Sequence, residues 1–585
     1  MGLLRSGNIL SWNKLKKTKE IIKNRGIDQF FTVYTRNKDN VTPKKAFGKE
    51  LELITVIKTG NKYKLYCGSE KIISKVEDSS VEYARYMVEI NNLIPYDDKT
   101  IKCVEDGIIK GISDIEKITE DNVSIIMMPC FPCMNFQYFY DLVPLTDDIT
   151  LSLNFPDNAI TQHKRFESFT KNIRNRRGKK PEGYIEVMDD INTKFDEYNK
   201  YIHIDSMGQG MGCCGLQVTM QGKTIAEARY VYDMMGILGP LLLRLTRGTP
   251  CANGKLLKTE TRWEMLEMSV DCRKTEERGS ECMYSNKYKE YPYSKKIPKS
   301  RCSPFDLFIS NDARNLDKYN DTNPPIHVPI FNKLIKKGVD EKLSRHVASL
   351  FIRDPIVSYD ETDESTFDDF ENIQSSNWRS VRFKVPTESS DKDLRGWKVE
   401  VRPMEMQATP FENAAFIYFT YLTVQAILQY NLNFYIPVSK VDTNFIRANH
   451  FIRKASDYKF KLSEDEQKFW YRSNFDSNEE AQICEGTIKD IFIGSESEKG
   501  ILYYIYKVID ENFFDHRDFL LEYIKFIEDK INNKYLSYGD WIRKFIINHT
   551  DYKQDSKISD KILQDLIERI INIRKENNLD YLKNI

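Results

Sequence analysis

The chain has 585 residues, and its 87 Lys and Arg residues balance its 87 Asp and Glu residues, so no net charge favours binding to nucleic acid or to an acidic membrane. Its eleven cysteines are scattered and the amino-terminal segment lacks a secretory signal, from which we expect a cytoplasmic protein with free thiols. The longest apolar run, 234–245, is too short to cross a bilayer.

Strand-like segments dominate the first 130 residues. Apolar spacing after Ser11 predicts a helix over 9–26 that ends at Gly26. Strands are then predicted at 50–57, 62–68, 84–90 and 123–131. The first two flank Lys-Thr-Gly-Asn, and this arrangement predicts a hairpin.

Helices dominate the later part of the chain. The predicted elements are a glycine-rich loop leading into a strand at 203–222, a helix at 225–245 interrupted near Gly239 and Pro240, a strand at 397–407, a buried helix at 411–430 and a mostly helical region after 457. Polar composition predicts loops near 276–300 and 358–395, and the acidic run 360–372 is typical of a solvated face. Irregularly mixed strands and helices favour an α+β fold with an antiparallel sheet.

Five glutamates lie in strand-like, otherwise apolar surroundings: Glu50, Glu52, Glu82, Glu89 and Glu400. Glu50 and Glu52 share one face of a strand, whereas Glu82 needs a bulge or a strand entry to reach the face of Glu89. Converging carboxylates repel one another unless they are protonated or neutralised, and oxygen ligands suit Mg²⁺. The alternative for each residue taken singly is an exposed strand position or an ion pair with lysine.

Basic residues accompany these acids. Arg402 follows Glu400 on the same strand face, Arg382 and Lys384 alternate in another segment, and Arg262 opens a third. Magnesium ligands interleaved with arginine and lysine are what phosphoryl transfer from a nucleotide requires. A plain ion pair between Glu400 and Arg402 is the alternative.

Two further segments carry weaker signals. The glycine loop 207–215 could approach a ligand closely, and Gln217 after it could supply a neutral oxygen ligand. The basic run 171–180 lacks interleaved aromatic residues, so it favours an exposed helix end or a local phosphate contact over a nucleic-acid surface.

Long stretches of the chain together resemble the eukaryotic-type catalytic subunit of glutamate–cysteine ligase, also called γ-glutamylcysteine synthetase. They include FGKELE (47–52), EYARYMVE (82–89), NIRNRRG (172–178), MGQGMGCCGLQVTMQ (207–221), RWEMLEMSVDCRKTEERG (262–279), HVASLFIRDP (346–355) and VEVRPMEMQATPFENAA (399–415). They occur in the family's order and the resemblance runs nearly end to end.

The resemblance implies a fold akin to glutamine synthetase, with an antiparallel sheet forming a funnel and helices packed outside. It implies one catalytic unit over 1–585, with a sheet-containing core (1–457) and a mostly helical part (458–585). The implied reaction joins the γ-carboxylate of L-glutamate to the amine of L-cysteine, consumes ATP and depends on two or three Mg²⁺ ions. This reaction is the first step of glutathione synthesis.

Site residues carry over from the family one by one. The implied metal ligands are Glu50, Glu52, Glu82, Glu89, Gln217 and Glu400. Arg262 and Arg402 match arginines that hold glutamate and the developing phosphate, and Lys384, with Arg382 beside it, matches the nucleotide phosphate site. Met211 matches a segment that borders both the nucleotide and the glutamate. Trp378 and Cys302 match the lining of the cysteine side, where Cys302 replaces a tyrosine of the family.

Several departures leave alternatives open. The turn after Glu89 and the segment 107–113 differ from the family, and Gly215 and Cys272 replace a cysteine and an aspartate. The alternatives are a weakened, nucleotide- or glutathione-binding regulatory relative and a ligase for another amine. Asp518 stands where animal members bond a modifier subunit, so we expect a non-covalent modifier or a homodimer, with feedback binding of glutathione allowed.

Overall fold

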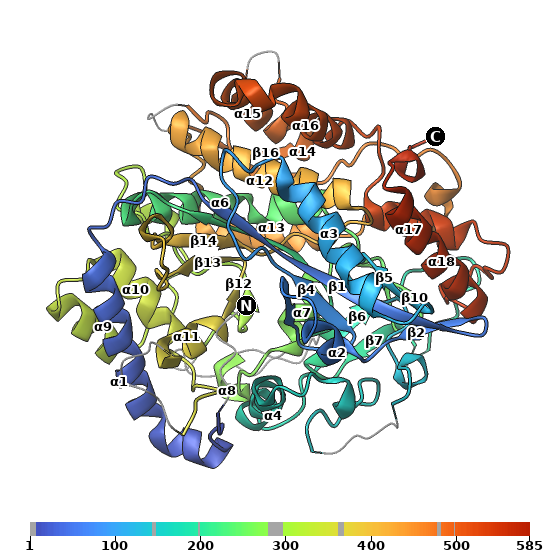
Figure 1. Ribbon diagram of the computed structural model, residues 1–585, viewed down its shortest axis with the longest axis horizontal. Coiled ribbons are helices and arrows are strands. Elements are labelled where there is room, and N and C mark those ends of the chain that lie inside the picture. Colours follow the sequence, from blue (N-terminus) through green and yellow to red (C-terminus); the bar gives the residue numbers. More distant parts are fainter. Residues whose placement is uncertain are drawn as a thin grey trace.

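An antiparallel eight-stranded sheet forms the centre of the computed structural model, which describes residues 7–142, 148–196, 199–278, 296–360, 368–476, 481–495 and 498–585 (Figure 1). The strand order is β13-β14-β8-β1-β4-β3, and β2 and β5 also pair with β1. The strands are β1 (Phe47–Thr59), β2 (Lys62–Leu65), β3 (Ser79–Val81), β4 (Met87–Ile90), β5 (Val123–Ile126), β8 (Leu216–Gln221), β13 (Val381–Lys384) and β14 (Lys398–Val401). The predicted α+β class with an antiparallel sheet is confirmed.

Strand β1 organises this sheet because it is long enough to pair with four other strands. Leu51, Leu53 and Ile54 are completely buried, as expected of a central strand. The predicted hairpin forms, since Val56 to Thr59 pair with residues 62–65 across a turn that contains Gly60 in the left-handed region. The strands predicted at 84–90, 123–131 and 397–407 are shorter than expected.

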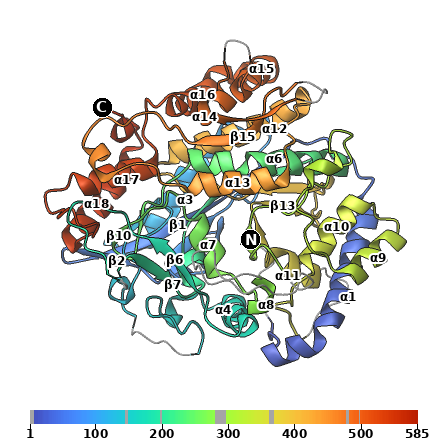
Figure 2. The same cartoon turned by 180° about the vertical axis from the view of Figure 1, so that it is seen from behind.

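Long helices cover one side of the sheet, where α6 (Ile225–Leu245) packs on β13 and β14 and α12 (Pro410–Gln429) packs on β8 (Figures 1 and 2). Helix α12 is apolar on all sides and almost wholly buried, because α3 (Cys103–Ile118), α15 (Ile501–Asn512) and α16 (Arg517–Ile531) surround it. Thr409 caps its first turn, so the predicted helix over 411–430 is confirmed.

The predicted helix end at Gly26 and the predicted helix interruption near Gly239 and Pro240 are both wrong. Helix α1 spans Trp12–Asn37 and runs through Gly26, which lies against α11 (Asp368–Ser375), since an added Cβ would come within 3.2 Å of the backbone nitrogen of Phe370. Helix α6 continues through Pro240, although proline removes one backbone hydrogen bond there. Gly26 and Pro240 are both buried within their helices, so packing outweighs their local preference to end or interrupt a helix.

The loop predicted over 358–395 is also partly wrong. It contains α11, β12 (Trp378–Arg379) and β13. The acidic run predicted to be solvated lies outside the described residues for 361–367, but Asp369 is buried and accepts hydrogen bonds from Arg25 Nε at 2.7 Å and Ser358 Oγ at 2.8 Å. Most of the segment 276–300 likewise lies outside the described residues.

The remaining elements surround this core. The further strands are β6 (Gly183–Glu186), β7 (Tyr201–Ile204), β9 (Cys251–Ala252), β10 (Lys255–Leu256), β11 (Cys302–Ser303), β15 (Lys468–Arg472) and β16 (Ile483–Thr487). The further helices are α2 (Ser69–Ile73), α4 (Lys164–Arg177), α5 (Gly208–Met211), α7 (Trp263–Ser269), α8 (Thr275–Arg278), α9 (Val328–Lys336), α10 (Glu341–Leu350), α13 (Val438–Asn449), α14 (Ile488–Phe492), α17 (Tyr538–Ile547) and α18 (Asp560–Glu576).

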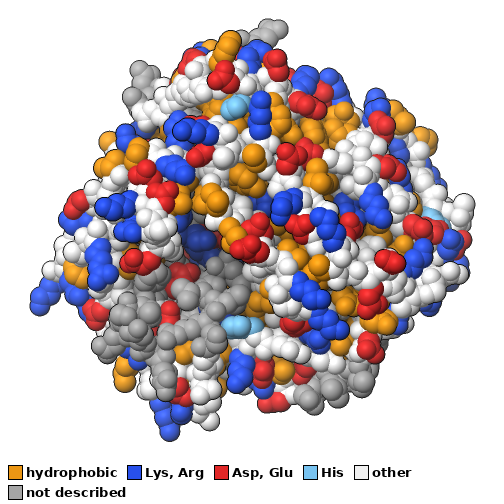
Figure 3. Space-filling model, viewed as in Figure 1, with side chains coloured by type: hydrophobic (Ala, Val, Ile, Leu, Met, Phe, Trp, Pro, Cys, Tyr) orange, Lys and Arg blue, Asp and Glu red, His pale blue; other side chains and the backbone are white. Residues whose placement is uncertain are grey.

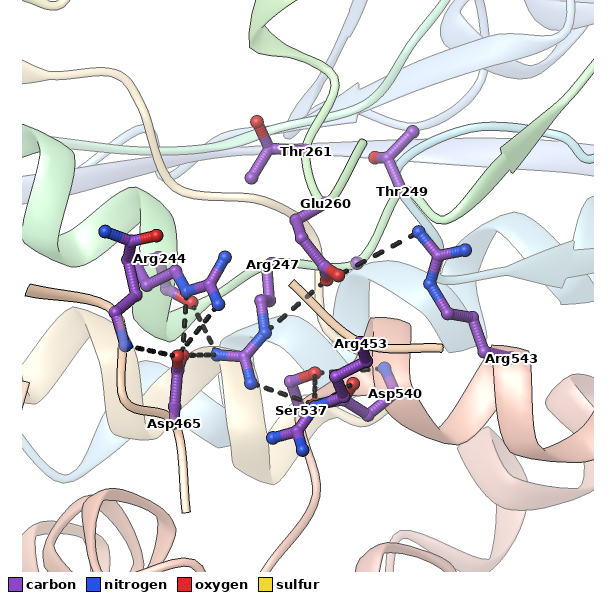
Figure 4. A network of polar contacts seen from close by, with 12 residues as sticks. Arg244, Arg247, Thr249, Glu260, Thr261, Arg453, Asp465, Ser537, Asp540 and Arg543 are labelled. Atoms are coloured by element: carbon purple, nitrogen blue, oxygen red, sulfur yellow. Dashed lines mark hydrogen bonds and ion pairs between the residues drawn. The ribbon is translucent and has the colours of Figure 1, made fainter. Parts of the chain in front are cut away.

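Buried ion pairs tie the region after residue 457 to the sheet-containing part of the chain (Figure 4). Arg247, just beyond α6, points toward Asp465 at 3.1 Å, Asp540 at 2.8 Å and Glu260 at 3.5 Å. Because charges this deep in the protein are costly when unpaired, the two regions depend on each other for stability. The boundary at 457 remains a prediction, and the hairpin of β15 and β16 interrupts the expected helical region.

The surface shown in Figure 3 mixes basic and acidic side chains and carries no single large patch of one sign, in keeping with the balanced composition. None of the helices in the described part of the chain combines the length and the apolar composition of a membrane span.

Candidate active site

Residues from distant parts of the sequence meet in one pocket beside β1 and β8. Its lining comprises Glu52, Glu82, Met211, Cys213, Gln217, Arg262, Trp263, Leu266, Cys302, Trp378 and Arg402. Eight of these residues were predicted as site residues from the sequence, whereas Cys213, Trp263 and Leu266 were not. Arginines and carboxylates therefore share one pocket with an aromatic and a sulfur-containing wall.

Three buried glutamates form an acidic cluster at this pocket. Glu52 on β1 lies directly opposite Glu89 on β4, and Glu82 follows the end of β3. One carboxylate oxygen from each of the three residues lies within 4.8 Å of the others. Glu82 lies outside the strands, ahead of a turn that leads into β4. It therefore reaches the cluster without having to share a strand face with Glu89.

The charges of the acidic cluster are unfavourable without a counterion. Burial raises the pKa of Glu52 to about 7, and the neighbouring carboxylate of Glu89 acts in the same direction. Burial together with Glu52 and Glu89 raises the pKa of Glu82 well above its ordinary value. Glu89 Oε2 is buried without a hydrogen-bond partner. A set of carboxylate oxygens with an unused buried acceptor fits a hard divalent cation such as Mg²⁺.

A second, basic cluster surrounds Glu400 on β14. Arg402 pairs with Glu400, Lys384 Nζ lies 3.1 Å from it, and Arg382 Nη1 lies 3.3 Å from it. Although burial opposes ionisation, these three cations lower the pKa of Glu400 well below its ordinary value. Lys384 Nζ also lies 3.7 Å from Glu50, so this cluster contains three cations and two carboxylates.

Gln217 joins the two clusters. Its Nε2 donates to Glu52 Oε1 at 2.9 Å, and its Oε1 accepts a hydrogen bond from Arg402. Among the described residues, only Glu52, Glu82 and Glu89 form a set of three acidic, histidine or cysteine ligands close enough for one ion. The six predicted metal ligands are therefore divided between an acidic and a basic neighbourhood in this structure.

The altered turn after Glu89 supports this residue. Asn91 Nδ2 donates to Ser80 Oγ at 2.9 Å, and Ser80 Oγ donates to Glu89 Oε1 at 2.6 Å. The backbone N–H of Asn91 also donates to the carbonyl oxygen of Asp78 at 2.9 Å. The turn thus fixes the orientation of a carboxylate in the acidic cluster. Lys110, in the other altered segment, lies on α3 and pairs with Asp114 on the surface.

Cys302 and Trp378 form one part of the pocket lining. These residues are partners in the short parallel pairing of β11 and β12, and both are buried. The sequence predicted both of them as substrate contacts, and the structure places both in the pocket lining. Trp263 could have been found from its position beside Arg262, whereas nothing in the sequence singled out Leu266.

The basic run 171–180 is not simply exposed. Arg176 binds both carboxylate oxygens of Glu277 at 2.7 Å, and Arg177 lies 3.0 Å from Asp271. Both guanidinium groups are buried at the end of α4, so the expectation of an exposed helix end is wrong for these two residues. Their role in this structure is to tie α4 to the segment after α7.

Comparisons with known proteins agree across nearly the whole chain. A family model described as glutamate–cysteine ligase matches residues 1–573. The glutamate–cysteine ligase of Dictyostelium discoideum is 34% identical, covering 98% of this chain and 97% of its own length. The human glutamate–cysteine ligase catalytic subunit is 32% identical, covering 98% and 96%. A crystal structure of glutamate–cysteine ligase from Francisella tularensis with AMP is 11% identical, covers 93% of this chain and 91% of its own, and gives a TM-score of 0.43.

Proposed function

This chain belongs to the glutamate–cysteine ligase family, whose reaction is the first step of glutathione synthesis, and from that premise we propose how its pocket performs the ligation. The proposed substrates are L-glutamate, L-cysteine and ATP. The products are γ-glutamylcysteine, ADP and phosphate.

The acidic cluster of Glu52, Glu82 and Glu89 is the proposed site of one Mg²⁺ ion. Further ions, two or three in all, would draw Glu50, Gln217 and Glu400 into the set. Magnesium supplies charge neutralisation between the triphosphate and the glutamate carboxylate, two anions that must approach each other. Three buried carboxylates close enough to share one ion are the observation that carries the proposal.

The basic cluster is the proposed phosphate site. Lys384 and Arg382 would face the nucleotide phosphates, and Arg402 belongs both to this cluster and to the pocket lining. The γ-carboxylate of glutamate attacks the terminal phosphoryl group of ATP and displaces ADP, which gives γ-glutamyl phosphate. Arg402, which Glu400 and Gln217 hold at the pocket, stabilises the negative charge on the transferring group.

The amine of cysteine then attacks the acyl phosphate, and phosphate leaves as the amide bond forms. Arg262 holds glutamate in place during both steps, while Met211 borders glutamate and nucleotide. Cys302 and Trp378 form the wall against which the cysteine substrate lies. Holding the reactants in one orientation supplies much of the rate enhancement in reactions of this kind.

ADP release tests the proposal directly. The purified chain is incubated with ATP, Mg²⁺ and L-glutamate, and L-cysteine or another amine is added in turn. We expect turnover that depends on cysteine. Turnover with another amine would instead identify a different ligase, and nucleotide binding without turnover would identify a regulatory relative.

Other features of the family are proposed on the resemblance alone. They are a funnel-shaped sheet akin to glutamine synthetase, a cytoplasmic location, feedback binding of glutathione, and assembly with a non-covalent modifier subunit or as a homodimer. Asp518 is almost fully exposed on α16, and its carboxylate lies 3.3 Å from Arg517. A carboxylate cannot form a disulfide at this position, and the proposal of a non-covalent modifier rests on that substitution.

A further inference from the structure

A buried carboxylate outside the pocket lining holds one of the two pocket arginines. Glu405 follows β14 and is completely buried. Its Oε1 accepts the backbone N–H of Arg262 at 2.5 Å and lies 3.5 Å from Nη1 of the same arginine. One carboxylate therefore holds both the backbone N–H and the guanidinium group of Arg262.

The other oxygen of Glu405 fixes a second segment. Oε2 accepts the backbone N–H of Gly248 at 2.7 Å and the hydroxyl of Thr249 at 2.9 Å. Glu405 itself is held beside β8, because it forms a β-bridge with Gly215. The carboxylate of Glu405 therefore joins the Gly248–Thr249 segment to Arg262, while its backbone pairs with Gly215.

The direction of the Arg262 side chain follows from these contacts. Nη1 donates to the carbonyl oxygen of Pro403 at 3.2 Å, and an added Cβ at Gly215 would overlap Nη2. The guanidinium group therefore contacts the chain at Pro403 and Gly215, and Arg262 also lines the pocket. Gly215 also donates its N–H to Glu52 at 2.6 Å, so the same backbone supports the acidic cluster.

The segment before Arg262 is braced independently. Asn449 Oδ1 accepts hydrogen bonds from the hydroxyls of Thr259 and Thr261, each at 2.7 Å. Figure 4 shows that Glu260, next to Thr261, contacts both Arg247 and Arg543. Loss of Glu405 would leave Thr259 and Thr261 held by Asn449, and would release the backbone N–H and the guanidinium group of Arg262.

We propose that Glu405 is a positioning residue that aims Arg262 at the substrate pocket, and that Gly215 leaves the space this orientation needs. The inference rests on the proposed role of Arg262 in holding glutamate. Glu405 does not line the pocket, so it acts on the substrate only through Arg262.

Steady-state kinetics of Glu405→Gln provide the test. Glutamine cannot accept hydrogen bonds at both ends, so the variant releases either Arg262 or the Gly248–Thr249 segment. We expect the KM for L-glutamate to rise about tenfold, with a smaller change in kcat and in the KM for ATP. Thr249→Val removes one hydrogen bond to Glu405 but leaves the charge of Glu405 in place. We expect it to raise the KM for L-glutamate about twofold to fivefold.

Glu412→Gln is the matched control. Glu412 is equally buried, accepts hydrogen bonds from Thr409 and Tyr581, and lies in α12 away from the pocket lining. It should lower the melting temperature without changing the KM for glutamate. If Glu405→Gln lowered the melting temperature equally and left that KM within about twofold, Glu405 would be a structural residue only and the inference would be wrong.

A double mutant separates this inference from the proposed function. If Glu405 acts through Arg262, then Glu405→Gln adds nothing further to the KM effect of Arg262→Met. If the two substitutions instead multiplied each other's effect on the KM for glutamate, the positioning role of Glu405 would be wrong. An unchanged KM for glutamate in Arg262→Met alone would instead contradict the proposed role of Arg262. Thr249→Val remains informative if Glu405→Gln does not fold.

Discussion

Removing the charge of Glu52 should change how the stability of the magnesium-free protein depends on pH. The pKa of Glu52 is raised to about 7 in the folded chain by burial, against an ordinary value of 4.5. Below pH 4.5 the group is protonated in both the folded and the unfolded chain, and it has no pH-dependent effect. Between pH 4.5 and 7 the unfolded chain releases the proton while the folded chain keeps it, so the folded state loses stability as pH rises.

The size of this loss follows from the same pKa values. The free energy of unfolding should fall by at most about 3 kcal/mol between pH 4.5 and 7 because of this one group. For a chain of this length, that corresponds to a decrease of about 2–3 °C in melting temperature. Glu82 has a raised pKa for the same reasons and adds to the loss in the same direction.

Melting temperatures of the wild type and Glu52→Gln, recorded in EDTA from pH 4.5 to 7.5, measure the effect. The substitution leaves either Gly215 N–H or Gln217 Nε2 without its acceptor, which lowers stability by about 1–3 kcal/mol at every pH. The informative quantity is therefore the slope of the difference between the two proteins. We expect the melting temperature of the wild type to approach that of Glu52→Gln as pH rises, and saturating Mg²⁺ to restore the difference. If the difference in melting temperature between the two proteins stayed constant or grew with pH, the raised pKa of Glu52 in the folded chain would be refuted.

Three further changes test other parts of the site. Ser80→Ala should weaken the apparent affinity for Mg²⁺ in the ADP-release assay about tenfold or more, because Ser80 orients the carboxylate of Glu89, a proposed metal ligand. The neighbouring Ser79→Ala should leave this affinity unchanged. Lys384→Met should raise the KM for ATP about tenfold and leave the KM for glutamate near the wild-type value, which initial rates at varied ATP would measure. Gly215→Ala should displace Arg262 and raise the KM for glutamate, and an unchanged value would show that the guanidinium has room to move.

Much of the fold could be predicted where the sequence pattern is local. The hairpin of β1 and β2 has alternating residues and a turn glycine, and α12 has a capping threonine and a continuous apolar run. Predictions failed where distant packing decides the outcome. Gly26 resembles a helix end, yet it allows α1 to approach α11 closely, and Asp369 belongs to an acidic run but pairs with Arg25 in the interior.

The candidate site shows the same division. Glu50, Glu52, Glu82, Glu89 and Glu400 were singled out because a charge in an apolar strand is unusual, and Gln217 because it follows the glycine loop and could supply a neutral oxygen ligand. The sequence could not show that these residues separate into two neighbourhoods, because that depends on the pairing of β1 with both β4 and β8. Glu405 escaped notice because its importance comes from the backbone groups of Gly248 and Arg262, which no side-chain pattern reveals.

The separation of charge along β1 bears on the order of events in the pocket. Glu52 faces two further carboxylates, whereas two positions earlier on the same strand Glu50 faces Lys384. Under the proposed function, the cation would therefore bind at the Glu52 end of the site and the nucleotide phosphates at the Glu50 end. Gln217 lies between them and contacts both Glu52 and Arg402, so occupation of the acidic cluster would change the hydrogen bonding of Arg402 directly. Arg402 is bound to Glu400 in this structure, so under the proposed function it would reach a transferring phosphoryl group only by sharing that pairing with the incoming charge. Binding of a metal–nucleotide complex would then be coupled to the partial release of Arg402 from Glu400.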